Sequence, residues 1–309
     1  MTTNPHLLVA GTRLEIDGRL VKTARLEDEA FVDVDQPDAL IADLKRLRAA
    51  DILTFCQRLP LNTPQFRYPM EWESIAVLPV TTYEHWWTSQ INNKTRNLVV
   101  KARKKGVVLK RTAFDDQFVQ GVTAIFNETP IRQERPFLHY GKTFDTIKVQ
   151  FARYLFREEI VGAYLGDELI GFIMLANAGR FATLTQIISM QRHRDKSPNN
   201  ALIAKAVELC AERHIPHLVY ALWPRGSLRE FKRHNGFEEV KLPRYFVPLT
   251  TAGQLAVKLR LYRNPVEYLP EATILYLRGL RSQFYAYRYR EAMTARPSSE
   301  HSAASEVNG

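Results

Sequence analysis

Cysteine is scarce in this chain, whose 309 residues include only Cys56 and Cys210. These two residues form neither a metal-type nor a redox spacing, which argues against a disulfide framework. Long apolar runs are missing as well, since no stretch approaches the roughly 18 apolar residues that a membrane span needs. The N-terminus, MTTNPHLLVAGTRLEIDG, lacks the basic start and the long apolar stretch of a secretory signal. These absences predict a soluble, cytoplasmic protein.

The composition that remains is typical of a globular protein, with 45% hydrophobic and 11% aromatic residues. A chain of this length forms one large domain or two small ones that share an interface. The net charge is +10, because 43 Lys and Arg residues outnumber 33 Asp and Glu residues.

The positive charge is concentrated in residues 92–111, which contain eight basic and no acidic residues. A second basic cluster lies between Lys258 and Arg290. Such patches attract polyanions, namely nucleic acid, a phosphorylated cofactor or an anionic membrane. A solvated helix face is the alternative, and the sequence leaves both interpretations open.

Residues 1–81 form a strand-rich first unit with a helix near residues 37–50, and no chemistry is visible in it. Residues 82–105 predict one long basic helix. Thr81 and Glu84 stand at capping-box spacing at its start, and Gly106 is a stop signal at its end.

Residues 106–249 alternate between strand and helix patterns. Strands are expected at 106–111, 160–165, 169–176, 181–190, 217–222, 237–241 and 244–248, and helices at 115–128, 144–157, 198–213 and 227–234. Gly166 and Asp167 form the turn of a hairpin between two of these strands. Helices interleaved with strands indicate an α/β or α+β protein with a layered sheet.

Residues 250–293 predict a helical extension, and residues 294–309 are small and polar, as in a disordered tail. Tyrosine and arginine are abundant near the end of the extension. They would suit an anionic membrane surface or RNA, although such segments more often pack on their own domain.

The loop HRDKSPNN joins an apolar strand to the helix that follows it. Unpaired backbone N–H groups and the positive end of the helix dipole meet at such a junction, which predicts an anion site. Ser197 is a good N-cap and Pro198 a good first helical residue. Arg192, Arg194 and Lys196 add three cations, so a phosphorylated ligand is expected here.

The order of elements in residues 106–249 resembles the fold of the GNAT acyltransferase superfamily. Three motifs carry this resemblance. INNKTRNLVVKARKKGV is similar to the basic helix that leads into the catalytic domain of FemAB-like transferases, VGAYLGDELIGFIML to the GNAT hairpin, and SLREFKRHNGF to the late helix and strand. The resemblance implies a mixed, mostly antiparallel sheet flanked by helices, preceded by a partly degenerate N-terminal unit.

The resemblance also implies an N-acyltransferase whose donor is acyl-CoA, such as acetyl-CoA, and whose acceptor is an amine. The donor would lie where the strand ending near Met190 and the strand starting at His217 separate. Its pantetheine arm would pair with main chain at Ile187, Ile188 and Ser189. Its phosphates would meet the loop before the helix, at Arg192, Arg194, Lys196, Ser197, Asn199 and Asn200.

Two departures favour the FemAB-like branch, whose members transfer amino acids from aminoacyl-tRNA. The GNAT phosphate loop carries two glycines, which Ser197 and Asn199 replace here, and Pro198 removes one N–H from that loop. Lys232 stands where many GNAT enzymes carry a tyrosine that protonates the leaving thiolate, and FemAB-like sequences similarly show Phe-Lys at this point. Lys232 is therefore a catalytic candidate, as a proton donor or as a cation beside a tetrahedral oxyanion.

The loop NETPIRQERPFLHYGK lies where the superfamily forms its acceptor pocket. Glu128 and His139 are the candidate bases for the acceptor amine. The candidate substrate contacts are Arg132, Glu134, Arg135 and Tyr140. For each of them the alternative is a surface loop held by its own ion pairs.

The acceptor is expected to be a small amine or an amine on a peptidoglycan or glycan precursor, with tRNA and a membrane surface as further partners. No metal is expected, since His193, His214, His217 and His234 are too scattered for a ligand set. The rival from another functional class is a non-catalytic module that holds tRNA or another polyanion through residues 92–111.

Overall fold

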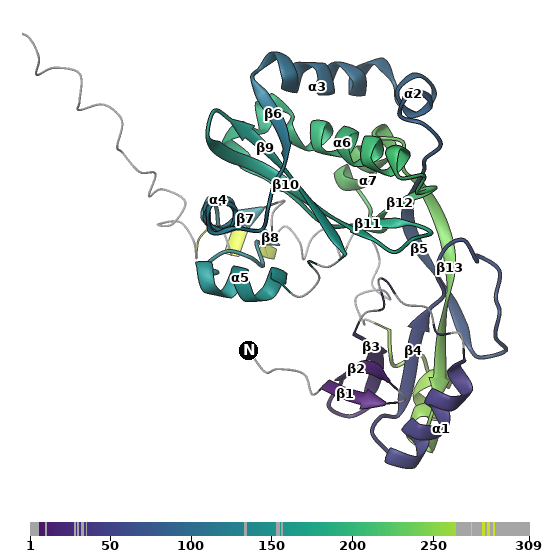
Figure 1. Cartoon of the computed structure of the whole chain (residues 1–309). Coiled ribbons are helices and arrows are strands. Elements are labelled where there is room, and N and C mark those ends of the chain that lie inside the picture. Colours follow the sequence, from purple (N-terminus) through teal and green to yellow (C-terminus); the bar gives the residue numbers. More distant parts are fainter. Residues whose placement is uncertain are drawn as a thin grey trace, which may run out of the picture.

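One continuous sheet runs through the computed structural model, which describes residues 6–263 apart from 10, 28, 30, 32, 33, 35, 133, 134, 153, 154 and 156, and also residues 273, 280, 281, 283, 284 and 287. Its 11 strands lie in the order β1-β2-β3-β4-β13-β5-β12-β11-β10-β9-β6 (Figure 1). The strands are β1 (His6–Val9), β2 (Thr12–Asp17), β3 (Thr23–Leu26), β4 (Ile52–Cys56), β5 (Met70–Pro79), β6 (Val107–Arg111), β9 (Glu158–Leu165), β10 (Glu168–Asn177), β11 (Ala182–Ser189), β12 (His217–Leu222) and β13 (Glu238–Pro248). A separate ribbon joins β7 (Ile131–Arg132) to β8 (Arg135–Pro136).

Antiparallel pairing dominates this sheet, and the described parallel pairs are β3 with β4 and β11 with β12. The predicted hairpin is confirmed, because Leu165 pairs with Glu168 across Gly166, whose φ is +60°. The two strands expected at 237–241 and 244–248 are one strand, β13. Pro243, which lies between the two expected ranges, is part of that strand and pairs in register with Trp72.

The long strands β5 and β13 lie in the middle of the sheet and connect its two halves. Residues 75–79 of β5 pair with β12, and residues 70–77 pair with β13. β13 in turn pairs with β4 through residues 244–248. The boundary predicted near residue 81 therefore falls just after a strand that both parts of the molecule share.

Helices cover both faces of the sheet (Figure 1). On the half from β6 to β12, one face carries α3 (Asn93–Lys104), α6 (Pro198–Glu212) and α7 (Ser227–His234), and the other carries α4 (Asp116–Asn127) and α5 (Phe144–Ala152). On the N-terminal half, α1 (Pro37–Leu47) and α8 (Thr251–Lys258) pack on opposite faces.

Strand alternation produces these separate cores. Along β10, Ile173 and Leu175 pack with α6, whereas Phe172 and Met174 pack with α4 and α5. Along β13, Tyr245 packs in the cluster of α1, and the neighbouring Phe246 packs with α8. Each face of the sheet therefore contributes a buried apolar layer.

The single helix predicted for residues 82–105 is wrong. Two short elements precede α3: α2 (Tyr83–His85) and the π-helical turn η1 (Trp86–Gln90). Ile91 is extended, with φ −117° and ψ 150°, and Asn92 starts α3 by accepting a hydrogen bond from the Thr95 N–H at 2.9 Å. The N-cap of α2 is Thr82 rather than Thr81, and the Thr82 side chain accepts a hydrogen bond from the His85 N–H at 3.0 Å.

The C-terminal predictions fall mostly beyond what the structure describes. The helical extension predicted for residues 250–293 begins as α8, and after residue 263 it lies almost wholly outside the described residues. The predicted tail at 294–309 lies entirely outside them. Within the described part of the chain, no helix combines the length and apolar character required to cross a bilayer.

Candidate active site

Strands β11 and β12 run side by side for only two residue pairs, Ala182 with Leu218 and Thr183 with Val219. Beyond them each strand stays paired with its other neighbour, β11 with β10 and β12 with β5. The separation expected from the resemblance is therefore confirmed. The main chain of β11 after Thr183 has no strand partner on its β12 side within the described residues.

Both strands are irregular where they diverge. The pairing of β11 with β10 shifts register between Met174 and Leu175, so Thr185 is the extra residue of a bulge. The pairing of β12 with β5 shifts between Val219 and Leu222, and Ala221 between them has φ +48°. Bulges re-aim side chains and are common beside active sites, so this junction has the form of a functional site.

Lys232 is buried beneath the end of β12. The side chain is 2% exposed and comes from α7. Its Nζ donates to the carbonyl of Tyr220 and, at 2.8 Å, to that of Leu222, and it lies 4.1 Å from the centre of the Tyr220 ring. Burial lowers the pKa of Lys232 to about 8. The ammonium group has three N–H donors, and these carbonyls take two of them.

The N-terminus of α6 lies after the 3₁₀ turn η2 (Gln191–Lys196). Ser197 occupies the N-cap position with φ +56°, but its side chain forms no capping hydrogen bond, contrary to the expected cap. Pro198 brings no N–H, and the buried Oδ1 of Asn199 has no hydrogen-bond partner in the described structure. Asn200 is buried and donates to Asn235 at 3.2 Å.

The cations predicted beside this helix start differ in their contacts. Arg192 pairs with Glu168, and His193 lies 2.9 Å from the same carboxylate. Lys196 pairs with Asp195 at 3.3 Å, and Arg194 is exposed. Of the predicted donor contacts on β11, the side chains of Ile187 and Ile188 join the cores on opposite faces of the sheet.

A carboxylate of the chain itself occupies the turn at the end of β11. The Glu128 carboxylate accepts from the N–H groups of Gln191 and Arg192 at 2.6 and 2.9 Å. Arg132 pairs with Glu128 at 3.3 Å and donates to the Ser189 carbonyl at 2.7 Å. Glu128 and Arg132, predicted as base and substrate clamp, are thus brought together, and both hold the loop after α4 against β11.

The rest of that loop is partly buried. His139 stacks on Phe126 with 4.4 Å between ring centres, and burial, with Lys142 and Arg132 nearby, lowers its pKa to about 4. Tyr140 is half-buried and Arg135 is exposed, whereas Glu134 lies outside the described residues. No described contact brings His139, Tyr140 or Arg135 to the junction of β11 and β12.

A groove of about 1220 Å³ runs between the N-terminal strands and the rest of the molecule, on the sheet face opposite α6; we call it the inter-unit groove. Thr183 and Thr185 of β11 and Ala221 of β12 line it, so it reaches the point where the two strands diverge. The half-exposed Trp72 and Leu222 are among its apolar walls.

This groove was not predicted from the sequence, because no candidate functional residue was recognised in residues 1–81. Charged residues at every second position were the available signal. Arg25, Glu27 and Glu29 alternate in this way, as do Glu71 and Glu73 on β5, and all five line the groove.

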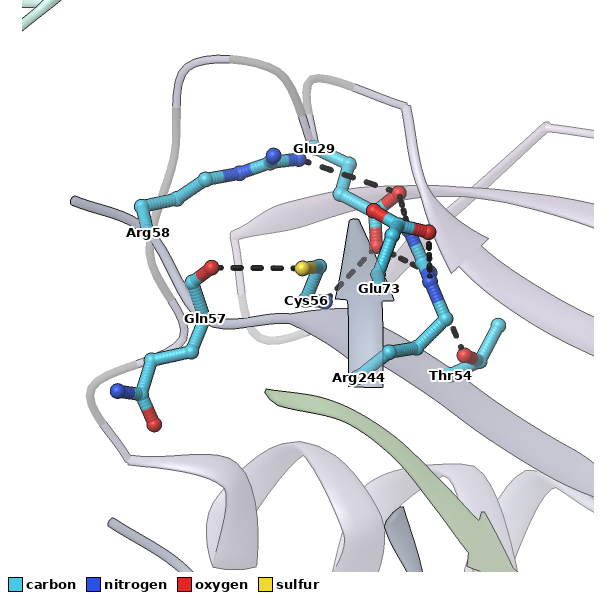
Figure 2. Close-up of polar contacts among 7 residues, drawn as sticks. All are labelled: Glu29, Thr54, Cys56, Gln57, Arg58, Glu73 and Arg244. Carbon is cyan, nitrogen blue, oxygen red and sulfur yellow. Dashed lines mark hydrogen bonds and ion pairs between the residues drawn. The ribbon is translucent and has the colours of Figure 1, made fainter. Parts of the chain in front are cut away.

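A cluster of charged side chains forms the wall at the N-terminal end. Figure 2 shows Arg244 between Glu29 and Glu73. Its guanidinium donates to Glu29 at 2.8 and 3.0 Å and to Glu73 at 2.6 and 3.1 Å. Glu29 also accepts from the Cys56 N–H at 3.0 Å and lies 4.0 Å from Arg58. Burial alone would raise the pKa of Glu73, but the hydrogen bonds and charge of Arg244 hold it below its ordinary value.

Both cysteines are free, buried thiols, and burial raises the pKa of each to about 12. Thiols of this kind are poor nucleophiles at neutral pH. Among the described residues, no group of three or more His, Cys, Asp and Glu side chains is arranged to hold a metal ion.

Comparison with known proteins finds solved structures of similar fold. No family model matches the sequence, and a search of curated proteins finds no match. L-PGS from Bacillus licheniformis matches with a TM-score of 0.56 and 10% identity, over 84% of this chain and 89% of that one. The C-terminal domain (DUF2156) of a putative lysylphosphatidylglycerol synthetase from Agrobacterium fabrum matches with a TM-score of 0.57 and 12% identity, over 83% and 87%. FemX matches with a TM-score of 0.48 and 11% identity, over 79% and 85%.

At these identities the likeness concerns the fold alone. It agrees with the large, mostly antiparallel sheet flanked by helices, which confirms the fold class predicted from the sequence.

Proposed function

We propose that this protein is an N-acyltransferase in which an amine attacks the carbonyl carbon of an acyl donor directly. The divergence of β11 from β12 carries the proposal. Among the described residues it leaves the β12 side of β11 without a strand partner after Thr183, and the buried ammonium of Lys232 binds the diverging end of β12. Main-chain N–H groups and an ammonium group suit the oxyanion that develops during acyl transfer. The inter-unit groove reaches the same junction on the sheet face opposite α6. The donor would bind on the α6 side of the junction and the acceptor would enter through the groove.

In the proposed reaction, a C–N bond forms at the donor carbonyl and the bond to the leaving sulfur or oxygen breaks. Lys232 would hold the oxyanion and then donate one of its own protons to the leaving sulfur or oxygen, while the attacking amine loses one N–H proton. The lowered pKa of Lys232, about 8, supports both roles, because the group is charged at neutral pH and can still release its proton. The reaction needs no covalent enzyme intermediate, so no activated Cys or Ser is required.

Two donors remain candidates, acyl-CoA and aminoacyl-tRNA, and the turn before α6 favours the second. The N–H groups of Gln191 and Arg192 are already taken by Glu128. Pro198 contributes no N–H either. A pyrophosphate would therefore bind poorly at this turn.

The exposed side of α3 supports a polyanionic donor. Five exposed cations lie along it, and none forms an ion pair with a described residue: Lys94, Lys101, Arg103, Lys104 and Lys105. α3 also contacts η2, so this surface adjoins the start of α6. Arg96 has a different task, because it donates to the carbonyls of Trp87, Thr88 and Ile91 at the break before α3.

Donor binding provides the first test. Acetyl-CoA should leave the melting temperature almost unchanged, whereas tRNA should bind with a steep salt dependence. The variant K101E/K104E should weaken tRNA binding and flatten that salt dependence. The matched variant K22E/K45E changes the net charge equally at exposed lysines outside both basic clusters and should leave tRNA binding intact. A marked stabilisation by acetyl-CoA would instead select acyl-CoA as the donor.

Turnover provides the second test. Radiolabelled acetyl-CoA and tRNA charged with radiolabelled amino acids are each incubated with the protein and ethanolamine as a probe amine. Lys232→Met should reduce acyl transfer by about 100-fold or more, since one oxyanion donor is typically worth that factor. Arg194→Ala should weaken donor binding. Wild-type rates in both variants would contradict these roles.

A non-catalytic module that holds tRNA through α3 is the second candidate, and the exposed cations of α3 are the observation in its favour. It predicts tRNA binding that is insensitive to Lys232→Met, together with no acyl transfer from either donor.

A further inference from the structure

Three of the acidic side chains in the inter-unit groove are engaged by cations of the chain. Glu29 and Glu73 pair with Arg244, and Glu71 pairs with Arg263. Glu158, at the start of β9, is different. It is half-buried, and no cation among the described residues pairs with it. It therefore keeps a carboxylate oxygen available to a ligand in the groove.

Glu158 forms a hydrogen bond with Thr185, which lies at the junction of β11 and β12. Its Oε1 lies 2.6 Å from the hydroxyl of Thr185, which is also 3.1 Å from the Met174 carbonyl. Thr185 is the bulged residue of β11, two positions beyond Thr183, where pairing with β12 ends. Glu158 and Thr185 both line the inter-unit groove. A carboxylate thus stands beside the unpaired main chain of β11, on the groove face.

We infer that Glu158 accepts the proton of the acceptor amine, which enters through the inter-unit groove. This inference rests on the proposed acyl transfer and adds the base that the reaction requires. As the amine nitrogen forms its bond to the donor carbonyl carbon, one N–H proton passes to the Glu158 carboxylate. The leaving sulfur or oxygen receives a proton in turn, so the products are an amide and a free thiol or hydroxyl.

The surroundings of Glu158 fit this task. Burial raises its pKa, and the hydrogen bond from Thr185 opposes that rise. A carboxyl with a raised pKa is a stronger base than an exposed one. The hydrogen bond to Thr185 also fixes the carboxylate, leaving its second oxygen to face the amine.

The two bases predicted from the sequence are less suited to this step. The Glu128 carboxylate is bound by Arg132 and by two main-chain N–H groups. His139 is stacked on Phe126, and its pKa of about 4 makes it a weak base. Glu158, in contrast, has a described contact with β11 at the divergence.

The kinetic test uses the full-length chain, the donor that supports turnover, and ethanolamine. Glu158→Gln should lower kcat about 100-fold, the lower end of what a general base contributes, with little change in KM for the donor. The acid limb of its pH–rate profile should disappear. Thr185→Val should move that limb to higher pH, because the hydrogen bond from Thr185 holds the pKa of Glu158 down and its loss lets that pKa rise. Glu159→Gln is the matched control. It removes the ion pairs of the neighbouring residue with Arg111 and Arg213, and it should leave the limb in place.

A second measurement does not depend on turnover. A water-soluble carbodiimide with ethanolamine converts accessible carboxyls into amides, which mass spectrometry of peptides identifies. The inference expects amide formation at Glu158, because the amine reaches it through the groove. An unmodified Glu158 beside modified exposed carboxyls would overturn the inference, and so would a wild-type pH–rate profile in Glu158→Gln. If wild-type protein transfers no acyl group from either donor, the proposed function fails, while the modification still decides whether an amine reaches Glu158.

Discussion

Arg244 is the side chain that ties the wall of the inter-unit groove together. From β13 it reaches Glu73 on β5 and Glu29 in the segment after β3. Each of the three side chains is about 80% buried. Two largely buried carboxylates are tolerated here because the planar guanidinium of Arg244 donates two hydrogen bonds to each of them.

Replacing Arg244 by Leu should lower the free energy of unfolding by about 3–5 kcal/mol, because two partly buried carboxylates would lose their shared cation. Urea unfolding at neutral pH measures the change. Arg46→Leu is the control, since Arg46 makes an exposed pair with Asp43 that is worth less than about 1 kcal/mol. Equal losses in the two variants would contradict the role given to Arg244.

Lys232 should make the stability of the protein depend on pH in the alkaline range. Its pKa is about 8 in the folded chain, against an ordinary 10.5, so above pH 8 the unfolded chain binds the proton more strongly. Below pH 8 the buried ammonium is charged, and this charge lowers the free energy of unfolding. As the pH rises from 8 towards 10.5, the folded chain loses the proton first, and the free energy of unfolding increases. The difference in free energy of unfolding between wild type and Lys232→Met should therefore shift in favour of wild type from pH 7 to pH 10. A constant difference would show that Lys232 titrates normally.

Residue roles stay predictions, but some of the residues' contacts are now known. The Phe-Lys pair predicted Lys232 as a catalytic candidate, and the structure shows that its ammonium donates to two carbonyls of β12. Glu158 and Thr185 could not be paired from sequence, because they lie on different strands and meet only through a bulge. Two adjacent glutamates, Glu158 and Glu159, look alike in sequence, yet one lines the groove and the other pairs with arginines.

At the scale of single elements, the segment before β6 is the most informative. Its basic composition and apolar stripe suggest one uninterrupted helix, but the cap at Asn92 and the extended Ile91 divide it. The division lets the buried Trp86 donate from its ring N–H to the Asn235 carbonyl at 3.0 Å, while α3 follows a separate axis over α6 (Figure 1).

Asn92→Ala should destabilise the protein by about 1 kcal/mol, because the Thr95 N–H loses its capping acceptor. Asn92→Asp keeps the acceptor and should restore most of the stability. Asn97→Ala, on the exposed face in the middle of α3, should be neutral or slightly stabilising, since alanine is the better helix former. Thermal unfolding of the three variants checks the order, and a neutral Asn92→Ala would refute the cap.

Most other elements were predictable because their hydrophobic periods are regular. β9, β10, α6 and α7 begin and end within two residues of the predicted bounds. The failures have local causes. Asn92 is an ordinary polar residue until its side chain turns back onto Thr95, and Pro243 resembles a strand end until its partner strand is known.

At the scale of the whole molecule, β5 lies between β12 and β13 in the sheet. Its residues Ile75 and Val77 also fill the core cluster that includes Phe181 and Leu242. The sheet that residues 106–249 form therefore lacks a central strand unless residues 70–79 are present. Sequence reasoning assigned that strand to the first unit, because order along the chain does not reveal order in the sheet.

A fragment covering residues 82–263 should fail to fold cooperatively, because its sheet would have a missing strand between β12 and β13. Circular dichroism and urea unfolding check this expectation. A fragment that begins at residue 69 restores β5 and should recover a cooperative transition, although without β4. Cooperative unfolding of the shorter fragment would indicate a self-sufficient domain instead.

The two shared strands also limit how the molecule can move. A flexible linker between two lobes permits a hinge. Here the two lobes are the N-terminal half of the sheet and the half from β6 to β12, and β5 and β13 connect them as hydrogen-bonded neighbours. Opening or narrowing the space between the lobes must then proceed by twisting an intact ribbon. Such a motion rotates Trp72 and Glu73 relative to Ala221, so the width of the entrance and the alignment of the reacting groups change together.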